Sequence, residues 1–200
     1  MCGIAGFLSY RSSGEDPAAR RRRLQAMGDA IAHRGPDDAQ YYDDGHLALV
    51  FRRLSIIDVD GGAQPMANED GRLRIAVNGE IYNHGALRAQ LRDRHRFASA
   101  SDSEVALHAW EEWGEASLER LHGMFAMVLW DRAARQLVLA RDRLGIKPLY
   151  VCELPHGLLF ASELKALLAH PDCPRAMDWQ AVDRPDTGQP CDTSYVRGVA

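Results

Sequence analysis

The second residue of the chain, Cys2, combines two reactive groups at one position. A methionine that precedes a small residue such as cysteine is usually removed, and its removal gives Cys2 a free α-amino group. Such an amine has a pKa of about 7.7–8.0, so a useful fraction of it is unprotonated at neutral pH and can act as a base. Thiol and base then belong to one residue, and no separate histidine is needed. Cys2 is therefore the candidate nucleophile.

The other cysteines and the histidines show no spacing typical of a metal site. Cys152, Cys173 and Cys191 form no C-x-x-C pair, and the eight histidines form no H-x-x-x-H motif. We therefore expect no metal ligands and no structural zinc, and we interpret these three cysteines as buried or incidental thiols.

The composition is that of an ordinary globular protein, with 46% apolar residues. The longest apolar runs have the length of strands, and the start of the chain lacks a secretory signal. We expect a cytoplasmic protein with reduced thiols and no membrane contact. A net charge of -4 gives no reason to expect a nucleic-acid partner. The basic run at residues 20–23 is interpreted as the solvated face of a helix.

A series of short motifs runs along the chain in a fixed order. They are MCGIAGF (1–7), HRGPDD (33–38), RLSIID (53–58), GAQPM (62–66), NGEIYN (78–83), SDSE (101–104), GMFA (123–126), RDRLGIKPLY (141–150) and ASELKAL (161–167). This series resembles the amino-terminal domain of glutamine-hydrolysing asparagine synthetases. That domain is a class II glutamine amidotransferase with the N-terminal-nucleophile hydrolase fold. The resemblance covers residues 2–182.

The resemblance implies a catalytic role for three residues. Cys2 would attack the side-chain amide carbon of L-glutamine and form a thioester while ammonia leaves. The side-chain amide of Asn78 and the backbone N–H of Gly79 would form the oxyanion hole. No metal or organic cofactor is implied for this reaction.

The resemblance also implies how glutamine is held. Arg53 would bind the α-carboxylate with its planar guanidinium. Asp102, together with Glu80, would receive the α-ammonium group. The segment comprising Leu54, Ser55, Ile56 and Ile57 would line the same pocket with backbone groups.

Taken one by one, the same residues have simpler local interpretations. Asn78-Gly79 is a dipeptide typical of a hairpin turn. Arg53 could be a solvated charge at the end of a strand, and Asp102 could cap a helix. The segments 34–37 (RGPD) and 141–150 (RDRLGIKPLY) are interpreted as holding loops and the sheet in place.

Hydrophobic periodicity and turn residues predict alternating groups of strands and helices. Helices are expected at about 18–33, 84–93, 102–113 and 162–170, with a capping box formed by Ser101 and Glu104. Strands are expected at 3–9, 47–51, 54–57, 73–77, 124–130, 136–141, 149–152 and 158–161. The connections between consecutive strands are too short for parallel crossovers, so mostly antiparallel sheets are expected.

The predicted elements are those of an α+β fold, and the resemblance to N-terminal-nucleophile hydrolases implies a four-layer αββα sandwich with two mostly antiparallel sheets between helices. The domain should span residues 2–182, and residues 183–200 are expected to be an unpacked tail or the start of a linker. No pyrophosphate-binding loop occurs in the sequence. ATP and Mg²⁺ would therefore belong to a synthetase domain that is absent from this chain. That domain would receive the ammonia.

Two other functions remain open from the sequence. The chain could supply ammonia to another acceptor, as asparagine-synthetase-like enzymes of peptide or glycan pathways do. Alternatively, it could be a truncated, catalytically idle binding module. The state of the N-terminus distinguishes the second case, because a retained Met1 would remove the base.

Overall fold

The computed structural model describes residues 1–10, 15–54, 63–176 and 196–199. The strands are β1 (Gly3–Ser9), β2 (Asp38–Asp43), β3 (Leu47–Arg53), β4 (Met66–Ala67), β5 (Leu73–Ile81), β6 (Gly123–Asp131), β7 (Gln136–Arg141), β8 (Tyr150–Leu154), β9 (Gly157–Ala161) and β10 (Val196–Val199). The α-helices are α1 (Pro17–Ala30), α2 (His84–Leu91), α3 (Asp102–Trp113), α4 (Ser117–Arg120) and α5 (Leu164–Leu168), and the 3-10 turns are η1 (Ala32–Arg34) and η2 (Gly114–Ala116).

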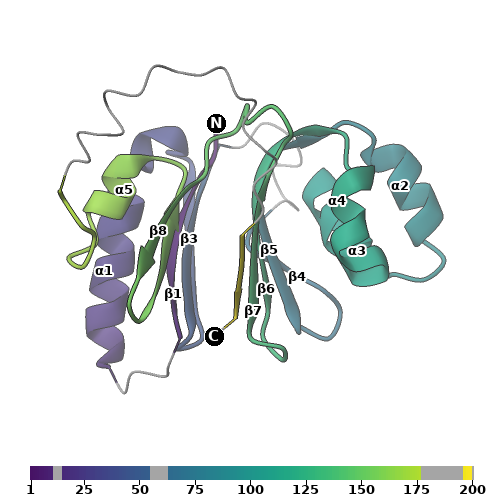
Figure 1. The fold of residues 1–200 in the computed structure, drawn as a ribbon. Helices are drawn as coiled ribbons and strands as arrows, with labels where there is room; N and C mark the ends of the chain where they lie inside the picture. Colours follow the sequence, from purple (N-terminus) through teal and green to yellow (C-terminus); the bar gives the residue numbers. More distant parts are fainter. Residues whose placement is uncertain (11–14, 55–62, 177–195, 200) are drawn as a thin grey trace.

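The strands form two five-stranded sheets that face each other. The first, the β1 sheet, has the order β2-β3-β1-β9-β8, and the second, the β6 sheet, has the order β10-β7-β6-β5-β4. Every strand pair within the described residues is antiparallel. Helices α1 and α5 cover the outer face of the β1 sheet, and α2, α3 and α4 cover that of the β6 sheet (Figure 1). The predicted αββα sandwich is confirmed.

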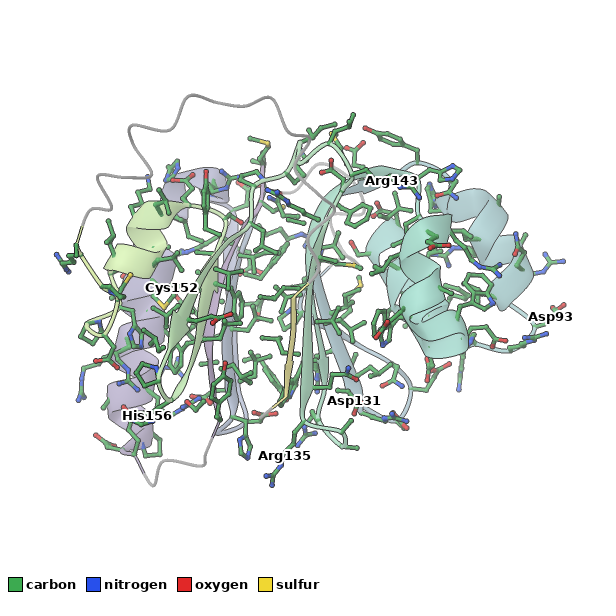
Figure 2. All side chains as sticks on the ribbon, viewed as in Figure 1. Asp93, Asp131, Arg135, Arg143, Cys152 and His156 are labelled. Atoms are coloured by element: carbon green, nitrogen blue, oxygen red, sulfur yellow. The ribbon has the colours of Figure 1, made fainter. Side chains whose placement is uncertain are left out.

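The central strands are apolar on both faces because both faces are covered. In β3, Leu47, Leu49 and Phe51 point into the layer between the sheets, whereas Ala48 and Val50 pack under the helices. Side chains fill the space between the sheets (Figure 2). Trp130, the largest fully buried side chain, lies in this layer. These packed layers hold the β1 and β6 sheets against each other.

The basic run at the start of α1 is not a solvated face throughout. Arg20 is only 3% exposed, and its guanidinium donates hydrogen bonds to Asp43 at 3.0 Å and to Ser9 Oγ at 3.0 Å. It also lies over the Phe7 ring, 4.9 Å from the centroid. The prediction was wrong for Arg20, since an ion pair with β2 lets the cation be buried.

Two predictions made from local turn and capping signals also differ from the structure. Asn78 and Gly79 lie inside β5, paired with Ala126 and Phe125 of β6, and do not form a turn. Ser101 caps α3 as predicted, but Glu104 accepts hydrogen bonds from Ala98 and Ser99 instead of completing a capping box.

The end of the chain also differs from the prediction. Residues 196–199 pair with β7 as β10, so this part of residues 183–200 belongs to the β6 sheet. A four-residue strand is too short to give a clear periodicity, and the exposed edge of β7 supplies the pairing. The strand predicted at 54–57 lies, apart from Leu54, outside the described residues.

Candidate active site

A cavity of about 110 Å³ lies where the start of the chain meets the middle of β5 and the first turn of α3. The predicted site residues that line it are Cys2, Arg53, Leu54, Asn78, Gly79, Glu80 and Asp102. They come from segments up to a hundred residues apart in the sequence. Ser55, Ile56 and Ile57 lie outside the described residues. The fold therefore gathers every predicted site residue that the structure describes into one cavity.

Cys2 immediately precedes β1, and its backbone is tightly held. The guanidinium of Arg34 donates a hydrogen bond from Nε to the Cys2 carbonyl at 2.9 Å and another from Nη1 to Glu163 at 2.9 Å. Two residues after Cys2, Ile4 of β1 donates its backbone N–H to Ser162 Oγ at 3.0 Å. These contacts confirm that Arg34 in the HRGPDD segment holds structure in place, and they fix the position of the Cys2 thiol.

Glu163, the carboxylate that pairs with Arg34, is ionised in the folded protein. Burial by itself would raise the pKa of Glu163, but hydrogen bonds from Arg34, Lys165 and His33 outweigh it and lower the pKa to about 2. Glu163 therefore stays charged over the whole physiological range. Arg34 keeps a permanent partner as a result.

The Cys2 thiol faces a backbone segment at the end of β3. Its sulfur lies 3.5 Å from the N–H of Leu54, which donates to it, and 3.7 Å from the Leu54 carbonyl. Cys2 is half-buried and not in a disulfide. A thiol that is held on one side and open to a cavity on the other suits a nucleophile.

Asn78 presents an unusual buried amide. Its side chain is 1% exposed, and within the described residues its Nδ2 has no hydrogen-bond partner. Leaving a buried donor unpaired costs about 1–3 kcal/mol, so such groups are rare unless a ligand uses them. Because Asn78 lines the cavity that contains Cys2, its N–H group is available to a bound molecule.

Gly79 is required by packing against the neighbouring strand. A Cβ at this position would lie 2.0 Å from the Met124 carbonyl oxygen and 2.6 Å from Phe125 Cα, both in the backbone of β6. No side chain fits there. The glycine next to Asn78 is thus explained by close strand contact, and the hairpin-turn interpretation of this dipeptide is wrong.

Charged groups of both signs line the same cavity. Asp102 is the first residue of α3, and its Oδ2 accepts the N–H of Ile81 at 2.7 Å, which ties the helix to the end of β5. Glu80 lies next to Gly79 on β5, and Arg53 ends β3 on the other sheet. A cavity with a guanidinium and two carboxylates suits a small zwitterion.

Sequence reasoning missed several residues that line the cavity. Gln64 is buried and donates from Nε2 to the Val77 carbonyl at 3.2 Å and to Ser103 Oγ at 3.3 Å, which supports β5 beside Asn78. Lys147 is buried at the cavity edge, near Met1. Both residues belong to the quoted motifs, so the motif series was the only signal that could have identified them.

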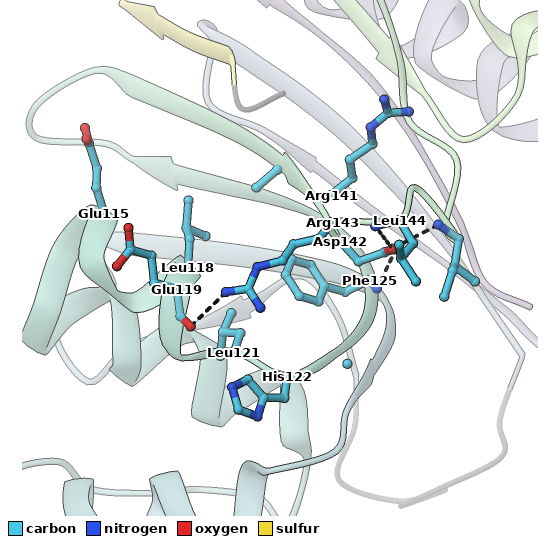
Figure 3. Close-up of a pocket in the computed structure, with 13 residues that line it drawn as sticks. Glu115, Leu118, Glu119, Leu121, His122, Phe125, Arg141, Asp142, Arg143 and Leu144 are labelled. Carbon is cyan, nitrogen blue, oxygen red and sulfur yellow. Dashed lines mark hydrogen bonds between the residues drawn. The ribbon is translucent and has the colours of Figure 1, made fainter. Parts of the chain in front are cut away.

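A larger cavity, about 560 Å³, lies between α4 and the segment after β7. Figure 3 shows Arg143 reaching Glu119, whose carbonyl accepts its hydrogen bond at 3.1 Å, while Asp142 binds several backbone N–H groups of the following turn. None of the predicted catalytic residues lines this cavity. It is therefore a poorer candidate for the active site despite its size.

The architecture is that of known amidotransferases. Glutamine phosphoribosylpyrophosphate amidotransferase from B. subtilis matches 84% of this chain with a TM-score of 0.64 and 21% sequence identity, over 43% of its own length. A structure described as the allosteric regulatory enzyme of purine biosynthesis matches with a TM-score of 0.65, 19% identity, and 84% and 43% coverage. At these identities the likeness concerns the fold.

Sequence comparison identifies the family. The model of the glutamine amidotransferase domain matches residues 1–193, and the chain belongs to this family. It is 46% identical over 180 residues to asparagine synthetase [glutamine-hydrolyzing] 2 of Bacillus subtilis, covering 90% of this chain and 24% of the relative. It is 43% identical over 169 residues to asparagine synthetase B of Escherichia coli, covering 84% and 30%.

The resemblance seen in the motif series is therefore confirmed. The chain spans about a quarter to a third of the length of these relatives. The family match also extends beyond the boundary predicted at residue 182. In the described part of the chain, no helix has the length and apolar character needed to cross a membrane.

Proposed function

We propose that this chain hydrolyses L-glutamine to L-glutamate and ammonia, with Cys2 as the nucleophile and Asn78 and Gly79 as the oxyanion hole. The observation that carries the proposal is the buried Nδ2 of Asn78, which has no hydrogen-bond partner among the described residues and lies in the cavity that also contains Cys2. A donor held ready in this way binds the negative charge that develops in acyl transfer.

The reaction starts once Met1 has been removed. The free amine of Cys2 takes the thiol proton, and the sulfur attacks the side-chain amide carbon of glutamine. The carbonyl electron pair moves to the oxygen, which is held by Asn78 Nδ2–H and the Gly79 N–H. When the carbonyl re-forms, the C–N bond breaks, and the ammonium of Cys2 gives its proton to the departing amide nitrogen, which leaves as ammonia.

The second half of the reaction releases glutamate from the enzyme. The amine of Cys2 takes a proton from water, and the resulting hydroxide adds to the thioester carbon. The same two donors hold the second oxyanion. Collapse breaks the C–S bond, and the ammonium of Cys2 returns its proton to the sulfur, which regenerates the thiol and the free amine.

The charged groups of the cavity orient the substrate. Arg53 binds the α-carboxylate of glutamine, and Asp102, with Glu80, binds the α-ammonium group. Leu54, which lines the cavity, adds backbone groups to this pocket. Holding both ends of the α-carbon group places the side-chain amide toward Cys2.

The thiol, the amine and the two oxyanion donors suffice for this chemistry without a cofactor. We further propose that the ammonia serves ATP- and Mg²⁺-dependent amidation of aspartate by a synthetase domain. The support is that the similar curated relatives are named as glutamine-hydrolysing asparagine synthetases. The cytoplasm, which keeps thiols reduced, is the proposed location.

Glutamate and ammonia formation by the purified chain tests the hydrolysis. Mass spectrometry first establishes that Met1 is absent, and Cys2→Ala serves as the control for contaminating glutaminase. We expect equal amounts of glutamate and ammonia from the parent chain and none from the variant. Equal rates from both proteins would refute the assignment. Glutamine-dependent asparagine formation with a synthetase domain, aspartate and Mg-ATP tests the acceptor.

A further inference from the structure

At the outer helical layer of the β6 sheet, two histidines and two glutamates that do not line the cavity with Cys2 converge. Glu69 comes from the β4–β5 connection, His95 from the turn after α2, and His108 and Glu111 from α3. One ligand atom from each lies within 4.8 Å of all the others. These four residues are called the imidazole–carboxylate cluster.

Two distances within the cluster are close to those between ligands of a small metal ion. Glu111 Oε2 lies 3.1 Å from His108 Nδ1 and 3.4 Å from His95 Nδ1. Glu69 Oε2 lies 4.0 Å from His108 Nδ1. Zinc–ligand bonds of about 2.0–2.1 Å place the donor atoms of a tetrahedral site about 3.3 Å apart.

Each carboxylate of the cluster has its other oxygen fixed by a neighbour. Asn68 donates from Nδ2 to Glu111 Oε1 at 2.8 Å, and the backbone N–H of Arg96 donates to Glu69 Oε1 at 2.7 Å. Metal sites typically hold their ligands through such outer contacts. The remaining oxygens are thereby directed toward the two rings.

The two histidine rings are largely buried, and they stack on each other. His108 is 1% exposed and the His95 side chain 10% exposed, and the rings stack with centroids 4.8 Å apart. On the far side, His95 Nε2 lies 3.4 Å from Glu112 and His108 Nε2 lies 3.8 Å from Glu104. Neither Nε2 makes a hydrogen bond to any residue that the structure describes. The negative charge of these two carboxylates beside the rings favours a cation bound at the other ring nitrogens.

Charge also favours a cation at this position. Four carboxylates surround the two rings, namely those of Glu69, Glu104, Glu111 and Glu112. Arg94 pairs with Glu112. Lone-pair atoms as close as these repel one another unless protons or a cation lie between them. A divalent ion would offset most of the excess negative charge.

We propose that the imidazole–carboxylate cluster binds one divalent zinc-type cation. Two imidazoles and two carboxylates form a donor set suited to zinc, whereas magnesium and calcium prefer oxygen ligands alone. Four protein ligands close the site, so its role is structural. The ion links α3 to the β4–β5 connection and to the turn after α2, and thereby stabilises the helices over the β6 sheet. Sequence spacing missed the site because its ligands come from three separate segments.

The test is a calorimetric titration of the chain with ZnCl₂ in the Cys2→Ala background, where the proposed active-site thiol cannot bind zinc. We expect one zinc per chain with a Kd of about 1 μM or tighter and no competition from Mg²⁺. Zinc at about a hundred times Kd should raise the Tm by roughly 5–10 °C. Because binding is measured without glutamine, the outcome is independent of the proposed hydrolysis.

Three variants locate the ion. His95→Gln should weaken zinc binding by at least about 100-fold, and Glu112→Gln by about 10- to 100-fold. His156→Gln, which replaces an exposed histidine on the opposite side of the molecule (Figure 2), should bind as the parent does. If His95→Gln fails to fold, Glu69→Gln replaces it, since the Glu69 side chain is 39% exposed. The proposal would be overturned if the chain showed no saturable zinc binding, or if the ligand variants bound zinc as tightly as His156→Gln. In either case only protons would bridge the atoms of the cluster.

Discussion

Replacement of Asn78 by alanine should greatly lower the activity and leave the stability of the fold nearly unchanged. The Nδ2 of Asn78 is a buried donor without a partner in the described residues, so the free protein already bears its desolvation cost of about 1–3 kcal/mol. Asn78→Ala removes that cost together with some packing contacts. The two effects oppose each other, and we expect the free energy of unfolding to change by less than about 1 kcal/mol.

The effect on catalysis should be far larger. Loss of one oxyanion donor raises the barrier by about 2.7–4 kcal/mol, which corresponds to a 10²–10³-fold decrease in kcat. KM should change little, because the donor acts mainly on the transition state. Steady-state glutamate formation, measured with a coupled dehydrogenase, gives both constants. Urea denaturation of the same protein gives the unfolding free energy.

Asn83→Ala is a suitable control because both the donor and the acceptor of the Asn83 side-chain amide make hydrogen bonds within the protein. Asn83 donates to the Arg120 carbonyl at 2.8 Å and accepts the N–H of His122 at 2.9 Å. Its loss should destabilise the fold by about 1–3 kcal/mol with kcat nearly unchanged. If Asn78→Ala retained a kcat within a few-fold of the parent, the assignment of its amide to the oxyanion hole would be wrong.

Three further perturbations address the rest of the site. Cys2→Ala should abolish ammonia release while glutamine still binds, as calorimetry can show; residual turnover in this variant would exclude Cys2 as the nucleophile. Arg53→Ala and Asp102→Ala should each raise KM by about 10- to 150-fold, the equivalent of a charge-assisted hydrogen bond, and an unchanged KM in both would contradict the substrate clamp. Glu163 has its pKa lowered to about 2 in the folded protein. The stabilisation of the folded state by ionised Glu163 is therefore complete above the unfolded pKa of about 4.5 and is lost as the pH falls toward 2. Glu163→Gln should lower the unfolding free energy at pH 7. In this variant the unfolding free energy should also fall less steeply between pH 4.5 and 2 than in the parent. Denaturation curves at several pH values measure this, and parallel curves for the two proteins would argue against a role for Glu163.

Local sequence signals predicted the elements whose own residues determine them. The bounds of α3 match the prediction because Ser101 caps its start and Gly114, with φ of 56°, ends it. The bounds of β7 match as well, because it is a short apolar run between turns. Antiparallel sheets followed from the short connections. These features depend on neighbouring residues, which the sequence displays directly.

Features that depend on distant segments were not accessible in this way. Asn78-Gly79 has a local preference for a turn, but pairing of nine β5 residues with β6 outweighs it. Arg20 is buried because Asp43 lies beside it in the fold, and β10 is defined by its pairing with β7. The roles proposed for Arg53, Asp102 and Glu80 came from the motif series, and the structure adds that they share one cavity with Cys2.

Covalent labelling of the purified chain with an electrophilic analogue of glutamine tests the central claim most directly. Peptide mapping by mass spectrometry should find one adduct, on Cys2 at a mature N-terminus without Met1. An excess of glutamine should slow the labelling, and Cys152, Cys173 and Cys191 should remain unmodified. Labelling of another cysteine, or of Cys2 at a rate that glutamine does not change, would contradict the assignment of Cys2 as the nucleophile of a glutamine site.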